Sequence, residues 1–285
     1  MDLSENKISE RASKIRESIV KMLVEAGSGH SAGPLGTTDF FASLFFGGEF
    51  NYRAEDPWWK GRDRLILSAG HLVPVLYASL AEAGYFDKKE LDTLRDINSR
   101  LQGHPHMRSL PGIENSSGPL GQGVSQAVGV AMVGKMDKKD WQVVCFSSDG
   151  EQQEGQVWEA YMTASKYELG NLCFVIDRNN IQIDGFTEEV MPLEPLRSKL
   201  SAFGLEVMVV DGHDIGSILG ALRKVKMSFK PSVIILETVP GKGVEFMEGL
   251  PEWHGKPPDV GETVKALSDI HELRSLGGEI ISEHD

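Results

Sequence analysis

Two polar turns that carry metal-binding side chains each follow an apolar run of the sequence. The first run, over 143–146, leads into Asp149, and the second, over 172–176, leads into Asn179. Carboxylate and amide oxygens are ligands that Mg²⁺ prefers, and phosphate oxygens commonly fill its remaining positions. The two turns therefore predict a metal-bridged diphosphate site.

The segment between the two turns has the pattern of a helix, so this part of the chain reads as strand, turn, helix, strand, turn. The right-handed crossover of such units brings the ends of both strands to the same edge of a parallel sheet. We therefore expect Asp149 and Asn179 to lie close together at the carboxyl edge of that sheet. Glu154 and Glu159 follow on the predicted helix, where either a functional or a solvated position is consistent with the pattern.

Four histidines lie in loops rich in glycine or proline rather than on helix faces: His30, His71, His104 and His254. Imidazoles donate hydrogen bonds to phosphate and hydroxyl oxygens, so a group of them suits a polar substrate. A zinc site at His104 and His106 is not favoured, because no cysteine or further histidine stands at ligand spacing.

A glycine-rich loop over 118–123 opens a predicted helix of small residues. Its backbone N–H groups could face an anion or a flat heterocycle, although a tight entry into the helix explains the glycines equally well. The glycines over 27–29 lack the spacing of a dinucleotide fingerprint and follow a helix rather than a strand, which excludes that class of site.

Hydrophobic periodicity predicts alternating helices and strands along the whole chain. The helices are expected over 5–26, 37–46 (with Thr37 or Thr38 as cap), 73–84, 88–99, 121–136, 214–227 and 261–276, and the strands over 64–68, 143–146, 172–176, 206–210 and 233–238. The segments 27–36, 101–123 and 239–258 are expected to be irregular. This alternation predicts one α/β domain over 1–285, a three-layer α/β/α fold with a mostly parallel central sheet.

The composition indicates which kinds of binding partner are disfavoured and where in the cell the protein is expected. The 285 residues include 29 Lys+Arg and 42 Asp+Glu, for a net charge of −13, which disfavours nucleic acid and anionic membranes as partners. Cys145 and Cys173 fall in predicted core strands, which favours buried thiols over a disulfide. The polar start has no signal-peptide core, and no apolar run is long enough to span a membrane, so we expect a cytoplasmic protein.

Taken together, these motifs resemble the thiamin diphosphate enzymes, and within them the transketolases, over nearly the whole chain. The metal motif of that family, Gly-Asp-Gly followed by an Asn-containing turn, reads here as 148–150 and 177–181. Ser148 replaces the first glycine, and we expect this change to affect the backbone of the turn more than the ligands. Further segments similar to transketolases follow in the same order, at 28–30, 68–71, 103–105, 118–123, 183–185, 211–214, 241–243 and 253–255.

The resemblance implies roles for the cofactor-binding residues. Asp149, the Asn179 side chain and the Ile181 carbonyl would bind Mg²⁺, or Ca²⁺ or Mn²⁺ in its place. Gly150 and His71 would contact the diphosphate of thiamin diphosphate.

The resemblance also implies roles for the residues around the rest of the site. Gly118, Pro119 and Leu120 would lie beside the aminopyrimidine. His30 and His104 would contact the sugar, and His254 would serve both the sugar and the diphosphate, which makes these three histidines the catalytic candidates. Glu154 and Glu159 would lie near a subunit interface and bond towards the glutamate that activates the cofactor.

The implied activity is the reversible transfer of a two-carbon ketol unit from a ketose phosphate to an aldose phosphate, as in the pentose phosphate pathway. The sequence ends at Asp285, before any pyrimidine-binding or carboxyl-terminal transketolase domain. We therefore expect the amino-terminal subunit of a split transketolase, inactive alone and paired with a carboxyl-terminal subunit in an α₂β₂ assembly. Two alternatives stay open: the α subunit of a 2-oxo-acid dehydrogenase, and a non-catalytic domain that binds cofactor or a partner.

Overall fold

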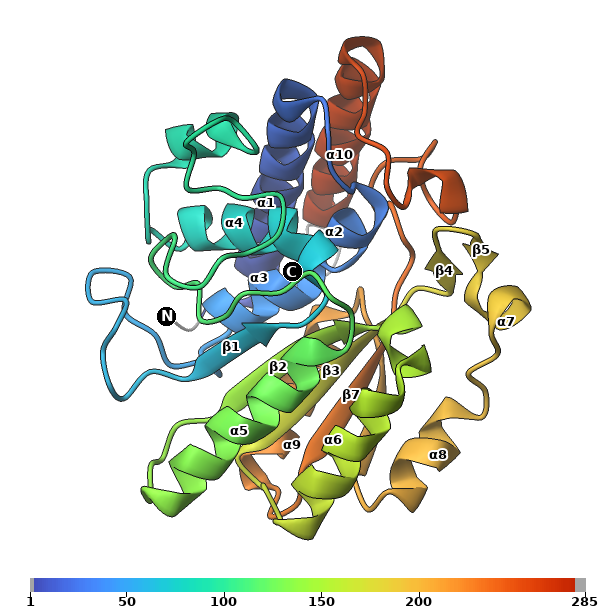
Figure 1. Cartoon of the computed structure of the whole chain (residues 1–285). Helices are drawn as coiled ribbons and strands as arrows, with labels where there is room; N and C mark the ends of the chain where they lie inside the picture. Colours follow the sequence, from blue (N-terminus) through green and yellow to red (C-terminus); the bar gives the residue numbers. More distant parts are fainter. Residues whose placement is uncertain (1–2, 280–285) are drawn as a thin grey trace.

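A parallel sheet of five strands forms the middle layer of the computed structural model, which describes residues 3–279 (Figure 1). In spatial order the strands are β1 (Arg64–Leu67), β2 (Val143–Ser148), β3 (Leu172–Arg178), β7 (Ser232–Glu237) and β6 (Glu206–Asp211). All five predicted strands are present, and the predicted α/β/α fold with a parallel sheet is confirmed.

Helices cover both faces of the sheet. On one face, in front in Figure 1, lie α5 (Gln122–Met136), α6 (Gly155–Lys166) and α8 (Leu196–Ala202). The opposite face carries α3 (Thr38–Phe46), α4 (Val73–Glu82) and α9 (Ile215–Met227), with α1 (Glu5–Ala26) and α10 (Val260–Glu279) packed side by side beyond them. Successive strand residues point to opposite faces, so Phe146 packs into one core and Cys145 into the other.

The helix α1 shows how the local sequence produces an element. Its apolar residues recur at helical spacing and are buried in the core, as at Ile8, Ile15 and Ile19. It ends where Gly27 adopts φ 56° and donates its N–H to the Val24 carbonyl, a left-handed cap that glycine adopts without steric cost. The chain then turns towards His30.

The register of the sheet places the two polar turns side by side. Ser148 pairs with Asp177, and the Asp149 N–H donates to the Asp177 carbonyl at 3.0 Å. The strands β2 and β3 therefore end level with each other, and their turns leave the sheet at the same edge, as the crossover rule predicts.

The prediction of an irregular segment over 27–36 is wrong for its second half. Ala32–Gly36 forms a short helix, α2, in which Leu35 donates to the Ser31 carbonyl. Burial of the segment against the core outweighs its glycine content. Thr37 precedes α3 as expected, but its hydroxyl donates backwards to the Gly33 carbonyl and so does not cap α3.

The predicted helix over 88–99 is also wrong. Only Lys88–Thr93 is helical, as a 3₁₀ segment, because Arg95 and Asn98 adopt positive φ values of 65° and 68° that no α-helix contains. The described part of the chain has three further 3₁₀ turns, at Gly70–Leu72, Gly150–Gln153 and Pro251–Trp253.

A group of short elements after β3 has no counterpart among the predictions. These elements are the antiparallel pair β4 (Ile181–Gln182) and β5 (Gly185–Phe186), then α7 (Thr187–Val190) and α8. The pair and α7 lie beyond the edge of the sheet in Figure 1. They are too short to show a hydrophobic period, and segments of this length depend on tertiary contacts for their stability.

Both cysteines are buried and unpaired, as predicted, and burial raises the pKa of each thiol. Among the described residues, no helix is long and apolar enough to cross a membrane.

The contact between α5 and β1 generates a stability prediction. A Cβ on Gly123 would come within 2.5 Å of Ser68 Cα, whereas a Cβ on Gly129 of the same helix would meet no atom within 4 Å. Gly123→Ala is expected to lower the free energy of unfolding by about 1–3 kcal/mol through overpacking. The matched control Gly129→Ala is expected to leave it unchanged or raise it by up to about 1 kcal/mol. Urea unfolding measures both, and equal effects of the two variants would contradict the close packing.

Candidate cofactor and substrate site

A cavity of about 410 Å³ opens at the edge of the sheet where β1, β2 and β3 end. Most of the predicted site residues line it: His30, His71, His104, Gly118, Leu120, Asp149, Gly150, Glu154, Asn179, Ile181 and His254. Pro119 and Glu159 are not among its lining residues. Glu159 is exposed on α6, so its predicted contact towards a partner stays a prediction.

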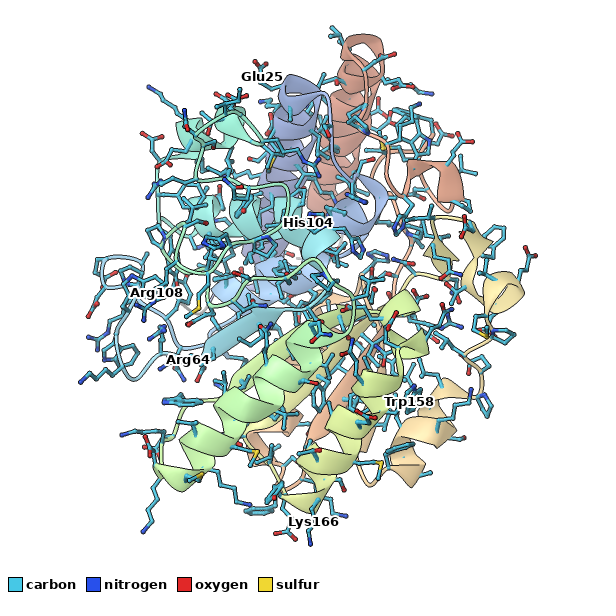
Figure 2. The ribbon with its side chains drawn as sticks, viewed as in Figure 1. Glu25, Arg64, His104, Arg108, Trp158 and Lys166 are labelled. Atoms are coloured by element: carbon cyan, nitrogen blue, oxygen red, sulfur yellow. The ribbon has the colours of Figure 1, made fainter. Side chains whose placement is uncertain are left out.

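Four histidines from four separate loops meet on one side of the cavity. The His30 ring centroid lies 5.3 Å from that of His71, 5.6 Å from that of His254 and 6.4 Å from that of His104. His71 follows β1, His254 belongs to the chain after β7, and His104 lies in the irregular segment before α5. Figure 2 shows His104 beyond the carboxyl edge of the sheet.

Partial removal from water favours the neutral form of these imidazoles, although His104 is exposed. Burial lowers the pKa of His30 to about 4, with further lowering by the neighbouring His254 and His104, and it lowers the pKa of His71, His104 and His254 as well. A neutral imidazole offers one N–H donor and one acceptor. Buried His254 Nδ1 has no hydrogen-bond partner within residues 3–279, and His254 is one of the residues that line the cavity.

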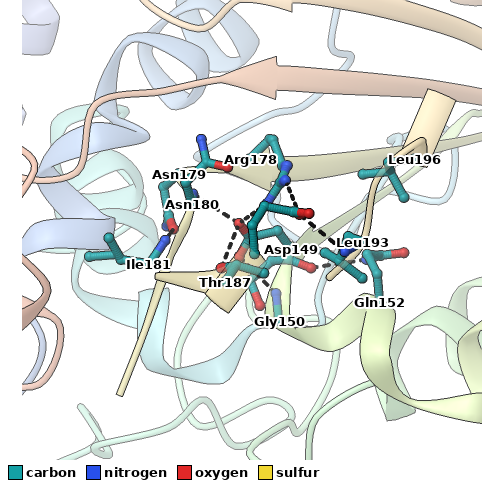
Figure 3. Close-up of polar contacts among 12 residues, drawn as sticks. Asp149, Gly150, Gln152, Arg178, Asn179, Asn180, Ile181, Thr187, Leu193 and Leu196 are labelled. Atoms are coloured by element: carbon teal, nitrogen blue, oxygen red, sulfur yellow. Dashed lines mark hydrogen bonds and ion pairs between the residues drawn. The ribbon is translucent and has the colours of Figure 1, made fainter. Parts of the chain in front are cut away.

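The two turns supply a charged part of the cavity lining through Asp149 and Asn179. Figure 3 shows the polar contacts that hold these side chains. Asp149 Oδ2 accepts from Arg178 Nη1 at 3.0 Å, from the Asn180 N–H at 2.9 Å and from Thr187 Oγ1 at 3.2 Å. Asp149 Oδ1 accepts only the Gly150 N–H, at 2.7 Å, among the described residues. Burial raises the pKa of this carboxyl group, and the guanidinium of Arg178 opposes the shift.

Asn179 is oriented by both ends of its amide. Nδ2 donates to Asp177 Oδ2 at 2.7 Å, and Oδ1 accepts from the Ile181 N–H at 3.0 Å. Burial raises the pKa of Asp177 to about 7. Asp177 itself is held by the Thr238 hydroxyl, so the amide is supported from the end of β7.

Ser148, which stands where the family motif has glycine, is the last residue of β2. Its N–H donates to Glu151 Oε2, and its carbonyl accepts from the Gln152 side chain. The serine thus fits an ordinary strand end, and the side chains of Asp149 and Asn179 still lie on the cavity.

Glu151 is a buried residue of the site that is not among the predicted site residues. It is fully buried, and its carboxylate accepts from Ser68 Oγ at 2.6 Å, the Gly121 N–H at 2.7 Å and the Ser148 N–H at 2.9 Å. It joins the ends of β1 and β2 to the start of α5. Burial raises its pKa, and these donors oppose the shift. Only its position, two residues beyond Asp149, could have marked it.

Several exposed apolar side chains lie at or near the mouth of the cavity. Ile183, Val190 and Leu120 line it and are 79%, 41% and 41% exposed, and Phe186 and Met191 lie beside them in sequence at 46% and 57%. Ile183 and Leu120 belong to motifs of the sequence, but the apolar rim has no counterpart among the predictions.

Comparison with known proteins identifies the family of this arrangement. Residues 8–272 match the family described as "Transketolase, thiamine diphosphate binding domain". The chain belongs to the transketolase family. It is 38% identical over 92% of its length to an apulose-4-phosphate transketolase subunit of Phocaeicola vulgatus, covering 93% of that protein. It is 42% identical over 85% of its length to "6-deoxy-6-sulfo-D-fructose transketolase subunit SqwG" of a Clostridium species, covering 88% of that relative.

Solved transketolase structures share the fold. The crystal structure of the Campylobacter jejuni transketolase superposes with a TM-score of 0.84 at 31% identity, over 98% of this chain. That alignment covers 48% of the Campylobacter chain, so the present chain spans about half the length of the solved transketolases that it matches. Human transketolase is 36% identical over 93% of this chain and is covered to 42%.

The buried Glu151 carboxylate generates a second stability prediction. Glu151→Ala leaves the Ser68, Gly121 and Ser148 donors buried without their acceptor, and an unsatisfied buried group costs about 1–3 kcal/mol. We expect the free energy of unfolding to fall by at least about 2 kcal/mol in urea titrations. The control is Glu90→Ala, which removes a half-exposed pair with Arg100 and is expected to cost less than about 1 kcal/mol. A loss for Glu151→Ala no larger than for this control would contradict the bridging role.

The low pKa of His30 generates a pH prediction. In the unfolded chain this imidazole titrates near 6.5, whereas in the folded chain it titrates near 4. Between these values the unfolded state binds more protons, so this residue lowers the stability as the pH falls through the window. His30→Asn removes the effect, and the stability of wild type relative to this variant should decline between neutral pH and about 4. Urea unfolding across the window measures it, and a constant difference would contradict the buried neutral state.

Proposed function

We propose that the chain is the amino-terminal, diphosphate-binding subunit of a two-subunit transketolase. It would transfer a two-carbon ketol unit reversibly from a ketose phosphate to an aldose phosphate in the cytoplasm. The observation that carries this proposal is the meeting of four neutral imidazoles and the Asp149–Asn179 turn pair around one cavity. The two relatives named as subunits carry the names of different sugars, so the proposal covers a class of donor.

The donor set of the cavity fits thiamin diphosphate with Mg²⁺. Asp149 Oδ1 has accepting capacity left, and Asn179 Oδ1 and the Ile181 carbonyl add two neutral oxygens, the ligand types that Mg²⁺ prefers. His71 would contact the diphosphate. The Gly150 N–H now donates to Asp149 Oδ1, so its own contact with the diphosphate requires that this hydrogen bond be shared or exchanged.

The remaining cavity residues would bind the organic parts of cofactor and substrate. Gly118 and Leu120 line the cavity and, with Pro119, would lie beside the aminopyrimidine. When bound, thiamin diphosphate supplies the stabilisation of a carbanion at the former carbonyl carbon. His30, His104 and His254 would hold the sugar hydroxyls and take up or return their protons at a ring nitrogen, which a neutral imidazole can do at neutral pH.

The second subunit would complete the site. We propose a carboxyl-terminal transketolase subunit that brings the pyrimidine-binding domain and the activating glutamate, in an α₂β₂ assembly. Glu154 and Glu159 are exposed at the start of α6, where a partner could reach them, and the apolar rim offers it a surface to cover. Unlike these exposed glutamates, Glu151 is buried and fully bonded, so it is unsuited to that contact.

The proposal is tested by purifying the chain with its native partner and assaying two-carbon transfer with thiamin diphosphate and Mg²⁺. A panel of ketose and ketose phosphate donors is offered with an aldose phosphate acceptor. Asp149→Ala should lower the activity about 10–100-fold or more at limiting Mg²⁺, with partial recovery at excess Mg²⁺. The exposed Asp92→Ala is the control and should keep wild-type activity. Full activity of Asp149→Ala without added metal would refute the ligand role, and turnover by the chain alone would refute the split site.

A further inference from the structure

Arg178 is a buried cation that serves three carboxylates at once. It is the last residue of β3, and its side chain is 6% exposed. Nη1 donates to Asp149 Oδ2 at 3.0 Å, while Nη2 donates to Glu188 and, at 3.2 Å, to Glu194. The planar fork of a guanidinium can hold several carboxylates in fixed positions, which the single ammonium of lysine cannot do. Neither the metal ligation nor the imidazole chemistry proposed above uses this residue.

The three carboxylates belong to two different parts of the chain. Asp149 directly follows β2, whereas Glu188 and Glu194 belong to the segment 187–194, which we call the cavity wall because its Val190 lines the cavity. Glu188 also accepts hydrogen bonds from the Leu193 and Glu194 N–H groups. These bonds join the beginning of the cavity wall to its end. Arg178 therefore ties the wall to the strand end that carries Asp149 (Figure 3).

The two carboxylate oxygens of Asp149 have different hydrogen-bond partners. Oδ2 takes Arg178, the Asn180 N–H and the wall residue Thr187, whereas Oδ1 takes only the Gly150 N–H among the residues described. A carboxylate held in this way by one oxygen presents the other in a fixed direction. Three carboxylates around one guanidinium also leave the cluster negative, which favours a cation at Oδ1.

We propose that Arg178 is a positioning residue that couples the metal-binding oxygen of Asp149 to the order of the cavity wall. The proposal rests on the proposed function, because it takes Asp149 as a metal ligand. A cation at Oδ1 holds the carboxylate in the orientation that Arg178 and Thr187 bind, so cation binding stabilises the wall. By linkage, an ordered wall strengthens cation binding by the same factor.

The first test uses the ligand-free chain and hydrogen–deuterium exchange of peptides from the wall. Arg178→Gln should speed exchange over 187–194 about tenfold or more, because a buried charge-assisted contact is lost, while peptides from α1 and β7 keep wild-type rates. Arg178→Lys should fall between the two, since lysine can reach one carboxylate at a time. The matched control is Arg62→Gln, which breaks a similarly buried pair with Glu114 and should leave the wall unchanged.

The second test adds Mn²⁺ and thiamin diphosphate to the chain and to its complex with the native partner, and counts bound Mn²⁺ by electron paramagnetic resonance. In wild type, loading should slow exchange of the wall. In Arg178→Gln the slowing should be absent, and Mn²⁺ should bind about tenfold more weakly. Equal slowing of the wall in wild type and variant would overturn the proposal, as would wild-type exchange of the ligand-free Arg178→Gln wall.

A second variant covers the case in which Arg178→Gln does not fold, and Mn²⁺ binding distinguishes failure of the coupling from failure of the proposed function. If Arg178→Gln does not fold, Glu188→Gln weakens the tie from the wall side and leaves Arg178 on Asp149 and Glu194, and it should speed exchange of the wall and, through the coupling, weaken Mn²⁺ binding. If wild type and complex bind no Mn²⁺ with thiamin diphosphate, the proposed function and the coupling fail together. Bound Mn²⁺ with no effect on the wall overturns the coupling alone.

Discussion

The site depends on one buried negative charge, the carboxylate of Glu151. A carboxylate taken out of water costs several kcal/mol unless donors surround it, and here three donors do so, from Ser68, Gly121 and Ser148. Each donor lies next to a different segment that lines the cavity. The loop after β1 carries His71, the segment before α5 carries Gly118 and Leu120, and the turn after β2 carries Asp149. The Glu151 carboxylate thus fixes the relative positions of three segments that line the cavity.

The cavity and its surroundings contain two groups of side chains that differ in charge, one neutral and one negative. In one part of the cavity, partial burial and the neighbouring histidines lower the pKa of His30 and His71, which favours the neutral imidazoles. In the other part, the carboxylates of Asp149, Glu188 and Glu194 surround the single guanidinium of Arg178. Because the carboxylates outnumber the guanidinium, the cluster keeps a net negative charge. Under the proposed function, the charged part would hold the metal-bound diphosphate of the cofactor, and the imidazoles would hold the uncharged hydroxyls of a sugar. This division follows from the parallel register, because β2 and β3 end level and present their turns together.

The sequence predicted those parts of the structure that have a hydrophobic period or a short motif. It predicted the five strands, the parallel sheet and the long helices, because each buries a periodic apolar face. It also indicated which loops meet, since His30, His71, His104 and His254 stand in loops at one end of the fold. It failed at α2 and at the segment over 88–99, where burial and positive φ values override local composition. The bonding inside the site was beyond such reasoning, because Glu151 and Arg178 take their roles from distant partners such as Ser68 and Asp149.

The apolar rim has a consequence for how such a chain is made in a cell. Ile183, which lines the cavity, and Met191 keep most of their surface in water, and Phe186 and Val190 are also partly exposed. Contiguous exposed apolar surface promotes non-specific association until another surface covers it. Production of the chain in excess over whatever covers this rim would therefore favour aggregation, and balanced co-translation of the two proposed subunits from one message would avoid it.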